Sequence, residues 1–209
     1  MRVGVFFSGG KDSTISAFLM ESSGYEPVLI TFMPEKKHSY MLQGEALELT
    51  KLQAEAMSME HHTFTVSGQK EVEIEEMLKC VEGLSLEGIA AGALESEYQK
   101  QRVDYIANQL GVPSYSPIWK RMSVEELYRE MEIILVKVSS EGMGKELLGE
   151  KFRPNISTGH PLLEGGEAET AVLDAPFFTK RIVIKESSSI WHNTWGELLI
   201  KEAALENKP

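Results

Sequence analysis

The feature that most constrains the fold of this chain is a glycine turn between an apolar run and a stretch with helical spacing. Val3–Phe7 is apolar, Ser8–Ser13 reads Ser-Gly-Gly-Lys-Asp-Ser, and Thr14–Glu21 is amphipathic. Two glycines let backbone N–H groups converge without a Cβ in the way. The following helix adds the partial positive charge of its N-terminus, and Lys11 adds a full charge. A strand, turn and helix of this kind form a place to hold a phosphate.

The turn is not a Walker A loop. That motif needs a glycine six residues before the lysine and a serine or threonine directly after it, and these places hold Val5 and Asp12. The sequence therefore argues against a P-loop kinase or GTPase. An ordinary Gly-Gly turn with an exposed lysine is the structural alternative.

Strand-like and helix-like segments alternate through the first half of the chain. The alternation predicts a parallel sheet covered on both faces, which is a Rossmann-like α/β architecture. Such sheets bind ligands at the carboxyl ends of their strands, where the turn at 8–13 would lie. The predicted strands are 3–7, 28–33, 61–66 and 89–93, and the predicted helices are 14–22, 45–57, 72–81 and 96–110.

The pattern changes after about Pro117. A short helix at 123–130 and a strand at 133–138 precede a segment rich in glycine, proline and polar residues. Strand-like segments follow, of which 181–185 and 190–195 are joined by a serine run that suggests a hairpin. We therefore predict two domains: residues 1–118, which hold the phosphate turn, and residues 119–209, a smaller α/β domain with mixed strand pairing.

Composition limits the partners and the compartment. The net charge of −11 argues against broad nucleic-acid binding, although Lys100, Arg102, Lys120 and Arg121 lie close enough for a local basic patch. Cys80 is the only cysteine, so no intramolecular disulfide can form and a reducing compartment is expected. No apolar run of about 18 residues is present, which predicts a cytoplasmic protein without a membrane partner.

Further polar clusters accompany the turn. They are Ser39-Tyr40-Met41; Gly92-Ala93 with Ser96, Tyr98, Gln99 and Arg102; Ser116-Pro117-Ile118-Trp119; and Glu164-Gly165-Gly166-Glu167-Ala168-Glu169-Thr170 with Leu173-Asp174-Ala175-Pro176. The turn resembles the signature of the PP-loop ATP pyrophosphatases, which cleave ATP between its α- and β-phosphates. With the other clusters, residues 2–186 resemble the diphthine–ammonia ligase family. Two departures lie on the expected acceptor side: Leu163 and Ala168 stand where the family has glycine and tyrosine, and Leu42-Gln43 where it tends to have Phe-His.

The resemblance implies a specific reaction. Such enzymes amidate diphthine, a modified histidine of translation elongation factor 2, with ATP and ammonium, and they release AMP and pyrophosphate through an acyl-adenylate. One alternative is a tRNA-modifying PP-loop enzyme, although its thiolase members use several cysteines and the acidic charge disfavours a stable nucleic-acid partner. Another alternative is a non-catalytic ATP-binding module. A homodimer is left open.

The resemblance assigns ATP binding to the loop and to two nearby strand ends, with Lys11 and the loop amides on the β- and γ-phosphates. We expect Asp12 to bind Mg²⁺, because a carboxylate beside phosphates needs a cation; a helix-start carboxylate is the alternative. The expected ATP-binding residues are Ser8, Gly9, Gly10, Lys11, Asp12, Ser13, Thr31 and Gly92, and core packing is the alternative for Thr31.

Lys11, Asp12, Arg102 and Glu167 are the candidate catalytic residues. Arg102 could contact the α-phosphate or the substrate carboxylate, with a surface ion pair as its alternative. Crowded carboxylates raise one another's pKa unless a cation is near, so the acidic cluster is expected to hold trimethylammonium or ammonium, with a solvated acidic loop as its alternative. The expected substrate-binding residues are Ser39, Tyr40, Ser96, Tyr98, Gln99, Glu164 and Glu169, of which Ser96 could simply be a helix N-cap.

Overall fold

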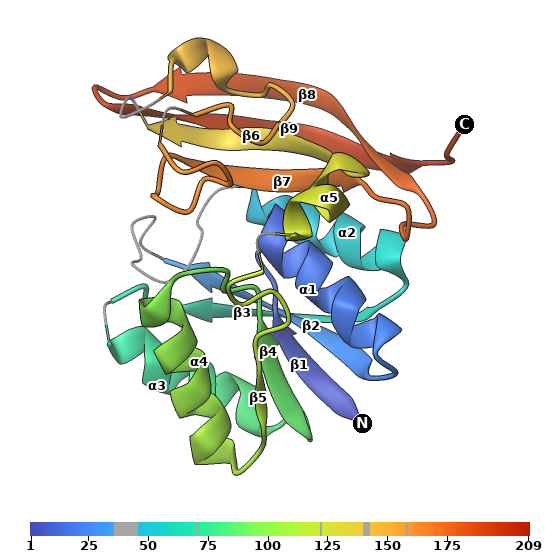
Figure 1. Cartoon of the computed structure of the whole chain (residues 1–209), viewed down its shortest axis with the longest axis vertical. Coiled ribbons are helices and arrows are strands. Elements are labelled where there is room, and N and C mark those ends of the chain that lie inside the picture. The colour runs from blue at the N-terminus through green and yellow to red at the C-terminus, as the bar shows by residue number, and fades with distance from the viewer. Residues whose placement is uncertain (36–45, 70, 122, 140–142, 158) are drawn as a thin grey trace.

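The computed structural model describes residues 1–35, 46–69, 71–121, 123–139, 143–157 and 159–209. The first half of the chain contains a five-stranded sheet in which all neighbouring strands are parallel (Figure 1). The strand order is β3-β2-β1-β4-β5, so strands are added on one side of β1 up to β3 and on its other side from β4 onward. This confirms the predicted parallel α/β fold and places its switch point beside the glycine turn. The strands are β1 (Arg2–Phe6), β2 (Glu26–Pro34), β3 (Glu60–Val66), β4 (Gly88–Ala91) and β5 (Ser114–Tyr115).

Helices cover both faces of this sheet (Figure 1). Alternate strand residues face opposite sides, so Val3 and Val5 join one apolar cluster while Val28 and Ile30 join another. The first cluster packs on α1 and α2, and the second on α3 and α4. The helices are α1 (Lys11–Ser22), α2 (Thr50–Met57, after the 3₁₀ turn Leu47–Leu49), α3 (Val72–Glu82) and α4 (Glu97–Leu110).

The second half is a four-stranded sheet in the order β7-β6-β9-β8, and each neighbouring pair is antiparallel. The expected mixed pairing is therefore wrong. The expected hairpin is also misplaced, because Ser187–Ser189 lies inside β8 and pairs with β9. Serine is common in turns, but here the backbone partners supplied by β9 outweigh that preference. The elements are α5 (Val124–Arg129), β6 (Glu132–Ser139), the 3₁₀ turn Lys145–Leu147, β7 (Ala168–Asp174), β8 (Arg181–Trp191) and β9 (Trp195–Glu206).

One apolar core connects the two sheets, because α1 and α2 lie between them (Figure 1). Ile15 of α1, Ala54 of α2, Leu135 of β6 and Val172 of β7 belong to the same buried cluster. Ile118, at the expected boundary, is fully buried in it as well. The division at residue 118 stays a prediction. No helix among the described residues is long and apolar enough to cross a membrane.

Candidate active site

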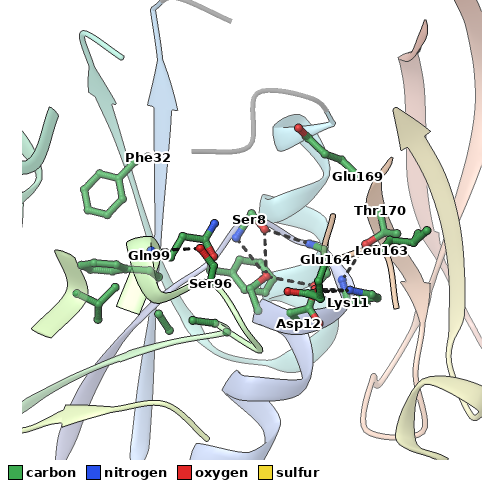
Figure 2. Close-up of a pocket in the computed structure, with 18 of the residues that line it drawn as sticks. Ser8, Lys11, Asp12, Phe32, Ser96, Gln99, Leu163, Glu164, Glu169 and Thr170 are labelled. Atoms are coloured by element: carbon green, nitrogen blue, oxygen red, sulfur yellow. Dashed lines mark hydrogen bonds and ion pairs between the residues drawn. The ribbon is translucent and has the colours of Figure 1, made fainter. Parts of the chain in front are cut away.

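A pocket of about 460 Å³ opens at the carboxyl ends of β1, β2 and β4, within the size range of about 300–1,000 Å³ usual for small-molecule sites. One end is apolar and is lined by Phe6, Ile30, Phe32, Met77 and Val103. The other end is formed by the turn at 8–13, apart from Gly9, and by six residues of the second half: Leu163, Glu164, Gly166, Ala168, Glu169 and Thr170. Figure 2 shows Phe32 and Lys11 on opposite sides, with Ser96 and Gln99 between them. The pocket therefore offers an apolar end and a charged end.

The turn at 8–13, here called the phosphate loop, is fixed from behind. Gly9 has φ +76°, and a Cβ at this position would collide with the side-chain amide of Gln53. The Gly9 carbonyl accepts hydrogen bonds from Gln53 Nε2 at 2.8 Å and from the Val172 backbone N–H at 3.1 Å. Within the loop, the Ser13 hydroxyl accepts a hydrogen bond from the Ser8 backbone N–H at 3.2 Å. Both conformation and space thus require glycine at position 9.

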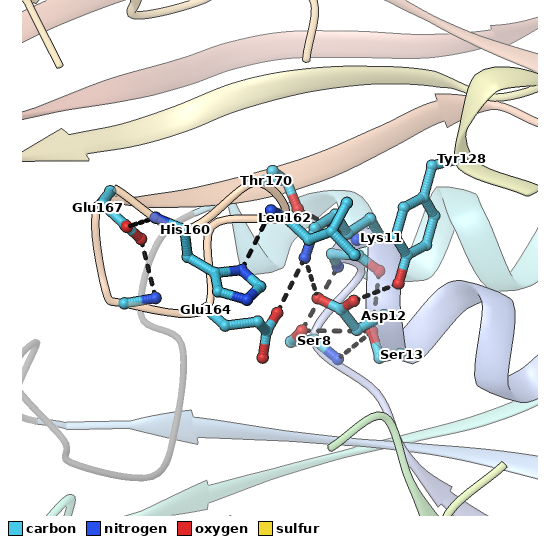
Figure 3. Close-up of polar contacts among 12 residues, drawn as sticks. Ser8, Lys11, Asp12, Ser13, Tyr128, His160, Leu162, Glu164, Glu167 and Thr170 are labelled. Atoms are coloured by element: carbon cyan, nitrogen blue, oxygen red, sulfur yellow. Dashed lines mark hydrogen bonds and ion pairs between the residues drawn. The ribbon is translucent and has the colours of Figure 1, made fainter. Parts of the chain in front are cut away.

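Lys11 is the buried cation of the site, with a relative exposure of 2%. Its Nζ lies 2.5 Å from Asp12 Oδ2 and 3.3 Å from Glu164 Oε1, and its backbone N–H donates to Thr170 Oγ1 at 3.1 Å (Figure 3). Burial acts to lower the pKa of Lys11, but the charges of Asp12 and Glu164 outweigh it and the pKa is raised. Lys11 is therefore held as a cation that bridges the two halves of the pocket wall.

Tyr128 of α5 orients the second oxygen of Asp12 (Figure 3). Its hydroxyl donates to Asp12 Oδ1 at 2.5 Å, and the residue is only 2% exposed. Burial, followed by the charge of Asp12, raises the pKa of Tyr128 far above its usual value, so the phenol stays a neutral donor. Asp12 is thus fixed between an ammonium and a phenol.

Glu164 and Glu169 both line the pocket. Burial and the nearby charge of Asp12 raise the pKa of Glu164 to about 7, although Lys11 acts in the opposite direction. Glu169 Oε1 accepts from Lys137 Nζ at 3.1 Å. Of the three carboxylates of the acidic cluster, these two therefore face the site.

Glu167 does not line the pocket. Its Oε1 accepts from the His160 backbone N–H at 2.5 Å, and its Oε2 accepts from the Gly165 backbone N–H at 2.9 Å (Figure 3). Burial acts to raise the pKa of Glu167, but these backbone bonds outweigh it and the pKa is lowered. The side chain closes the loop that carries Glu164 and does not reach the pocket, and its catalytic role stays a prediction.

The cluster at the start of α4 is divided between pocket and surface. Ser96 and Gln99 line the pocket, and Ser96 Oγ also caps α4 by accepting from the Gln99 backbone N–H at 3.3 Å. Tyr98 and Arg102 are not brought to the pocket. Arg102 pairs with Glu71 and stacks on Tyr98, with its Cζ 3.3 Å from the ring centroid. The arrangement matches the surface ion pair that was the alternative for Arg102.

Of the two expected ATP-binding residues at strand ends, Gly92 lines the pocket and Thr31 does not. A Cβ on Gly92 would lie 2.6 Å from backbone atoms of Asp12 and 2.7 Å from Ser13 N, so glycine lets β4 approach the start of α1. Thr31 is fully buried and does not line the pocket; its Oγ1 donates to the Phe7 carbonyl at 2.8 Å. Its neighbour Phe32 faces the pocket instead. Ser39 and Tyr40 lie outside the described residues.

A cation at this site would depend on few protein ligands. Within the described parts of the chain, no group of three or more His, Cys, Asp or Glu side chains converges on one point. Magnesium usually binds through one or two carboxylates together with substrate phosphates. The Asp12 carboxylate, which lines the pocket beside the phosphate loop, is a hard oxygen donor of that kind. The residues present therefore fit Mg²⁺ held largely by phosphates.

Three residues of the site were missed in the sequence. Gln53 and Tyr128 carry no local signal, because each reaches the phosphate loop from a helix distant in the chain. Thr170 directly follows the acidic cluster at 164–169, and this position was the only signal for it in the sequence.

Two family models together match most of this chain. The model of the diphthamide synthase N-terminal domain matches residues 1–114, and that of the diphthamide synthase C-terminal domain matches residues 119–205. A diphthine–ammonia ligase of Rattus norvegicus is 32% identical over 231 residues, which cover 92% of this chain and 86% of that protein. One of Schizosaccharomyces pombe is 29% identical over 245 residues, which cover 100% of this chain but only 40% of that protein.

Among solved structures, one described as a predicted subunit of tRNA methyltransferase from Methanocaldococcus jannaschii aligns with a TM-score of 0.48 at 19% identity. The alignment covers 84% of this chain and 98% of that chain.

Proposed function

This chain belongs to the diphthamide synthase family, and we propose that it is an ATP-dependent ligase that amidates diphthine on translation elongation factor 2. The products would be diphthamide, AMP and pyrophosphate, and ammonium would supply the nitrogen. The observation that carries the proposal is Lys11: a buried cation in a glycine loop, at the charged end of a pocket whose other end is apolar. Such a cation is suited to the phosphates of a nucleotide.

We expect the apolar end to take the adenine ring and the phosphate loop to take the triphosphate. The first turn of α1 presents amide donors that have no partner within the helix. One of them, the Lys11 N–H, is already used by Thr170, whereas the Gly10 N–H meets Ser8 Oγ only at 3.4 Å. A phosphate oxygen is a stronger acceptor than that hydroxyl, so the Gly10 N–H can donate to a phosphate in its place.

The proposed reaction consists of two successive displacement steps. A diphthine carboxylate oxygen attacks the α-phosphorus of ATP, the bond to the β-phosphate oxygen breaks, and pyrophosphate leaves. Ammonium then loses a proton, the resulting ammonia attacks the acyl carbon, the bond to the AMP oxygen breaks, and the amide forms with loss of a second proton. Lys11 and the loop amides stabilise the charge that collects on pyrophosphate. Mg²⁺, held by Asp12 and the phosphates, would further neutralise that charge.

Glu164 and Glu169 form the acceptor side of the proposed site. Their carboxylates lie on the pocket wall contributed by the second half of the chain, opposite the apolar end. A negative wall suits the fixed trimethylammonium of diphthine and an incoming ammonium ion. Leu163 also lines this wall with φ +66°, which is uncommon for leucine and marks a position where packing holds a strained backbone.

The test is release of AMP and pyrophosphate from ATP with ammonium, with and without elongation factor 2 that carries diphthine. Release should require the acceptor and should be lost in Lys11→Ala. Lys201→Ala is the matched control, because Lys201 is an exposed lysine of β9 that pairs with Glu186. Acceptor-independent binding of ATP without cleavage would instead favour a sensor, and stimulation by tRNA would favour a tRNA-modifying enzyme.

A further inference from the structure

Gln53 lies outside every motif found in the sequence, yet it contacts the phosphate loop from behind. It projects from α2 and is fully buried. Its Nε2 donates to two backbone carbonyls, those of Gly9 and Val172, each at 2.8 Å. One side chain thus connects α2, the phosphate loop and β7.

These bonds fix a peptide plane. The Gly9 carbonyl also accepts from the Val172 N–H at 3.1 Å, so donors from α2 and β7 hold it on one side. In a planar trans peptide the carbonyl and the following N–H point in opposite directions. The Gly10 N–H must therefore point away from Gln53, and it meets Ser8 Oγ, which lines the pocket together with Gly10.

Position 9 and Gln53 are matched to each other. The left-handed backbone of Gly9 (φ +76°) gives the turn its direction, and a Cβ there would occupy the place of the Gln53 amide. No other described side chain donates a hydrogen bond to the Gly9 carbonyl. Gln53 is accordingly built into the turn, although it is distant in sequence.

We propose that Gln53 is a positioning residue for phosphate binding: it holds the Gly9–Gly10 peptide so that the Gly10 N–H is directed at a β- or γ-phosphate oxygen of the nucleotide. This inference rests on the proposed use of ATP and does not depend on the identity of the acceptor. It predicts a defect confined to the phosphate end of the pocket.

The test compares two probes, inorganic pyrophosphate and adenosine, by calorimetric titration of the full chain. In Gln53→Met, which keeps the length of the side chain but removes its donors, the Kd of pyrophosphate should rise about tenfold, because a hydrogen bond to a charged group weakens while Val172 still holds the carbonyl. The Kd of adenosine should stay the same. Gln101→Met, on the exposed face of α4, is the matched control and should change neither value.

An unchanged pyrophosphate Kd, or an equal loss for both probes, would overturn the proposal, since equal loss indicates general damage. If Gln53→Met does not fold, Gln53→Glu provides the test. A buried protonated carboxyl supplies one donor in place of the two that Gln53 uses, so the Kd of pyrophosphate should rise while that of adenosine stays the same. A pyrophosphate Kd equal to that of the unaltered chain would contradict the inference. Failure of acceptor-dependent AMP release would refute the proposed function while leaving this comparison intact.

Discussion

Replacing Gly92 by alanine would test whether the close approach of β4 to α1 sets the geometry of the phosphate loop. The new Cβ would lie 2.6 Å from the carbonyl carbon and oxygen of Asp12 and 2.7 Å from the Ser13 nitrogen. All of these are backbone atoms, so no side chain can turn aside. An ordinary van der Waals contact of a Cβ begins near 3.4 Å. The end of β4 and the start of α1 must therefore move apart by about 0.8 Å.

The magnitude follows from that displacement. Adding a methyl group to a packed site costs about 1–3 kcal/mol, and each kcal/mol lowers the Tm of a chain of this size by about 2–4 °C. A loss of about 2 kcal/mol would thus lower Tm by about 4–8 °C. The displaced atoms carry Asp12 and Ser13, so the rate of ATP cleavage should fall as well, by on the order of 10²-fold for a shift near 1 Å.

Thermal unfolding and acceptor-dependent pyrophosphate release would measure the two effects. Gly83→Ala is the matched control, because a Cβ there meets nothing within 4 Å and the backbone is already helical, with φ −81°. That change should be neutral or stabilising by up to about 1 kcal/mol. If Gly92→Ala left both Tm and the rate as in Gly83→Ala, the inferred contact between β4 and α1 would be refuted.

Three further outcomes can be measured. Tyr128→Phe removes a hydrogen bond to the Asp12 carboxylate and should lower the free energy of unfolding in urea by about 1.5–3 kcal/mol; an unchanged value would mean that water replaces the phenol. Glu167→Gln places an amide donor against a loop N–H, so it should lower the free energy of unfolding by about 1–3 kcal/mol and leave the Kd of pyrophosphate unchanged. Loss of acceptor-dependent AMP release in a variant that is still folded would instead support the catalytic role expected from the sequence. The pKa of Glu164, raised to about 7, means that the folded chain binds this proton more tightly, so stability should fall as pH rises from about 4.5 to about 7. Glu164→Gln should remove that slope, and a slope equal to that of the unaltered chain in urea unfolding at about pH 5 and about pH 8 would contradict it.

The sequence alone was sufficient to predict the parallel sheet and the position of the phosphate loop, because both depend on local signals. Alternating apolar segments and a glycine turn after Phe7 determine the order of strand, loop and helix. Thr31 shows a limit of such reasoning: strand alternation already implies that Thr31 and Phe32 face opposite sides, but only the packed helices decide which side holds the pocket.

The rest of the site depends on contacts between distant parts of the chain. Glu164 and Glu167 look equivalent in the sequence, and only the folded loop directs one into the pocket and the other onto backbone amides. Ser187–Ser189 reads as a turn, yet pairing with β9 makes it part of a strand. Gln53 and Tyr128 could not be singled out, since a glutamine or tyrosine on a helix is usually ordinary packing.

The hydrogen bond between Gly9 and Val172 also has a consequence for how the protein is made. The phosphate loop leaves the ribosome well before β7, the strand that helps to hold it. A nascent chain that ends before β7 has the residues of the loop but lacks two of the contacts that shape it, Val172 on Gly9 and Thr170 on Lys11. In chains arrested at successive lengths, residues 8–13 should become resistant to proteolysis only once β7 has emerged, so the proposed nucleotide site is completed about 160 residues after its motif has been synthesised.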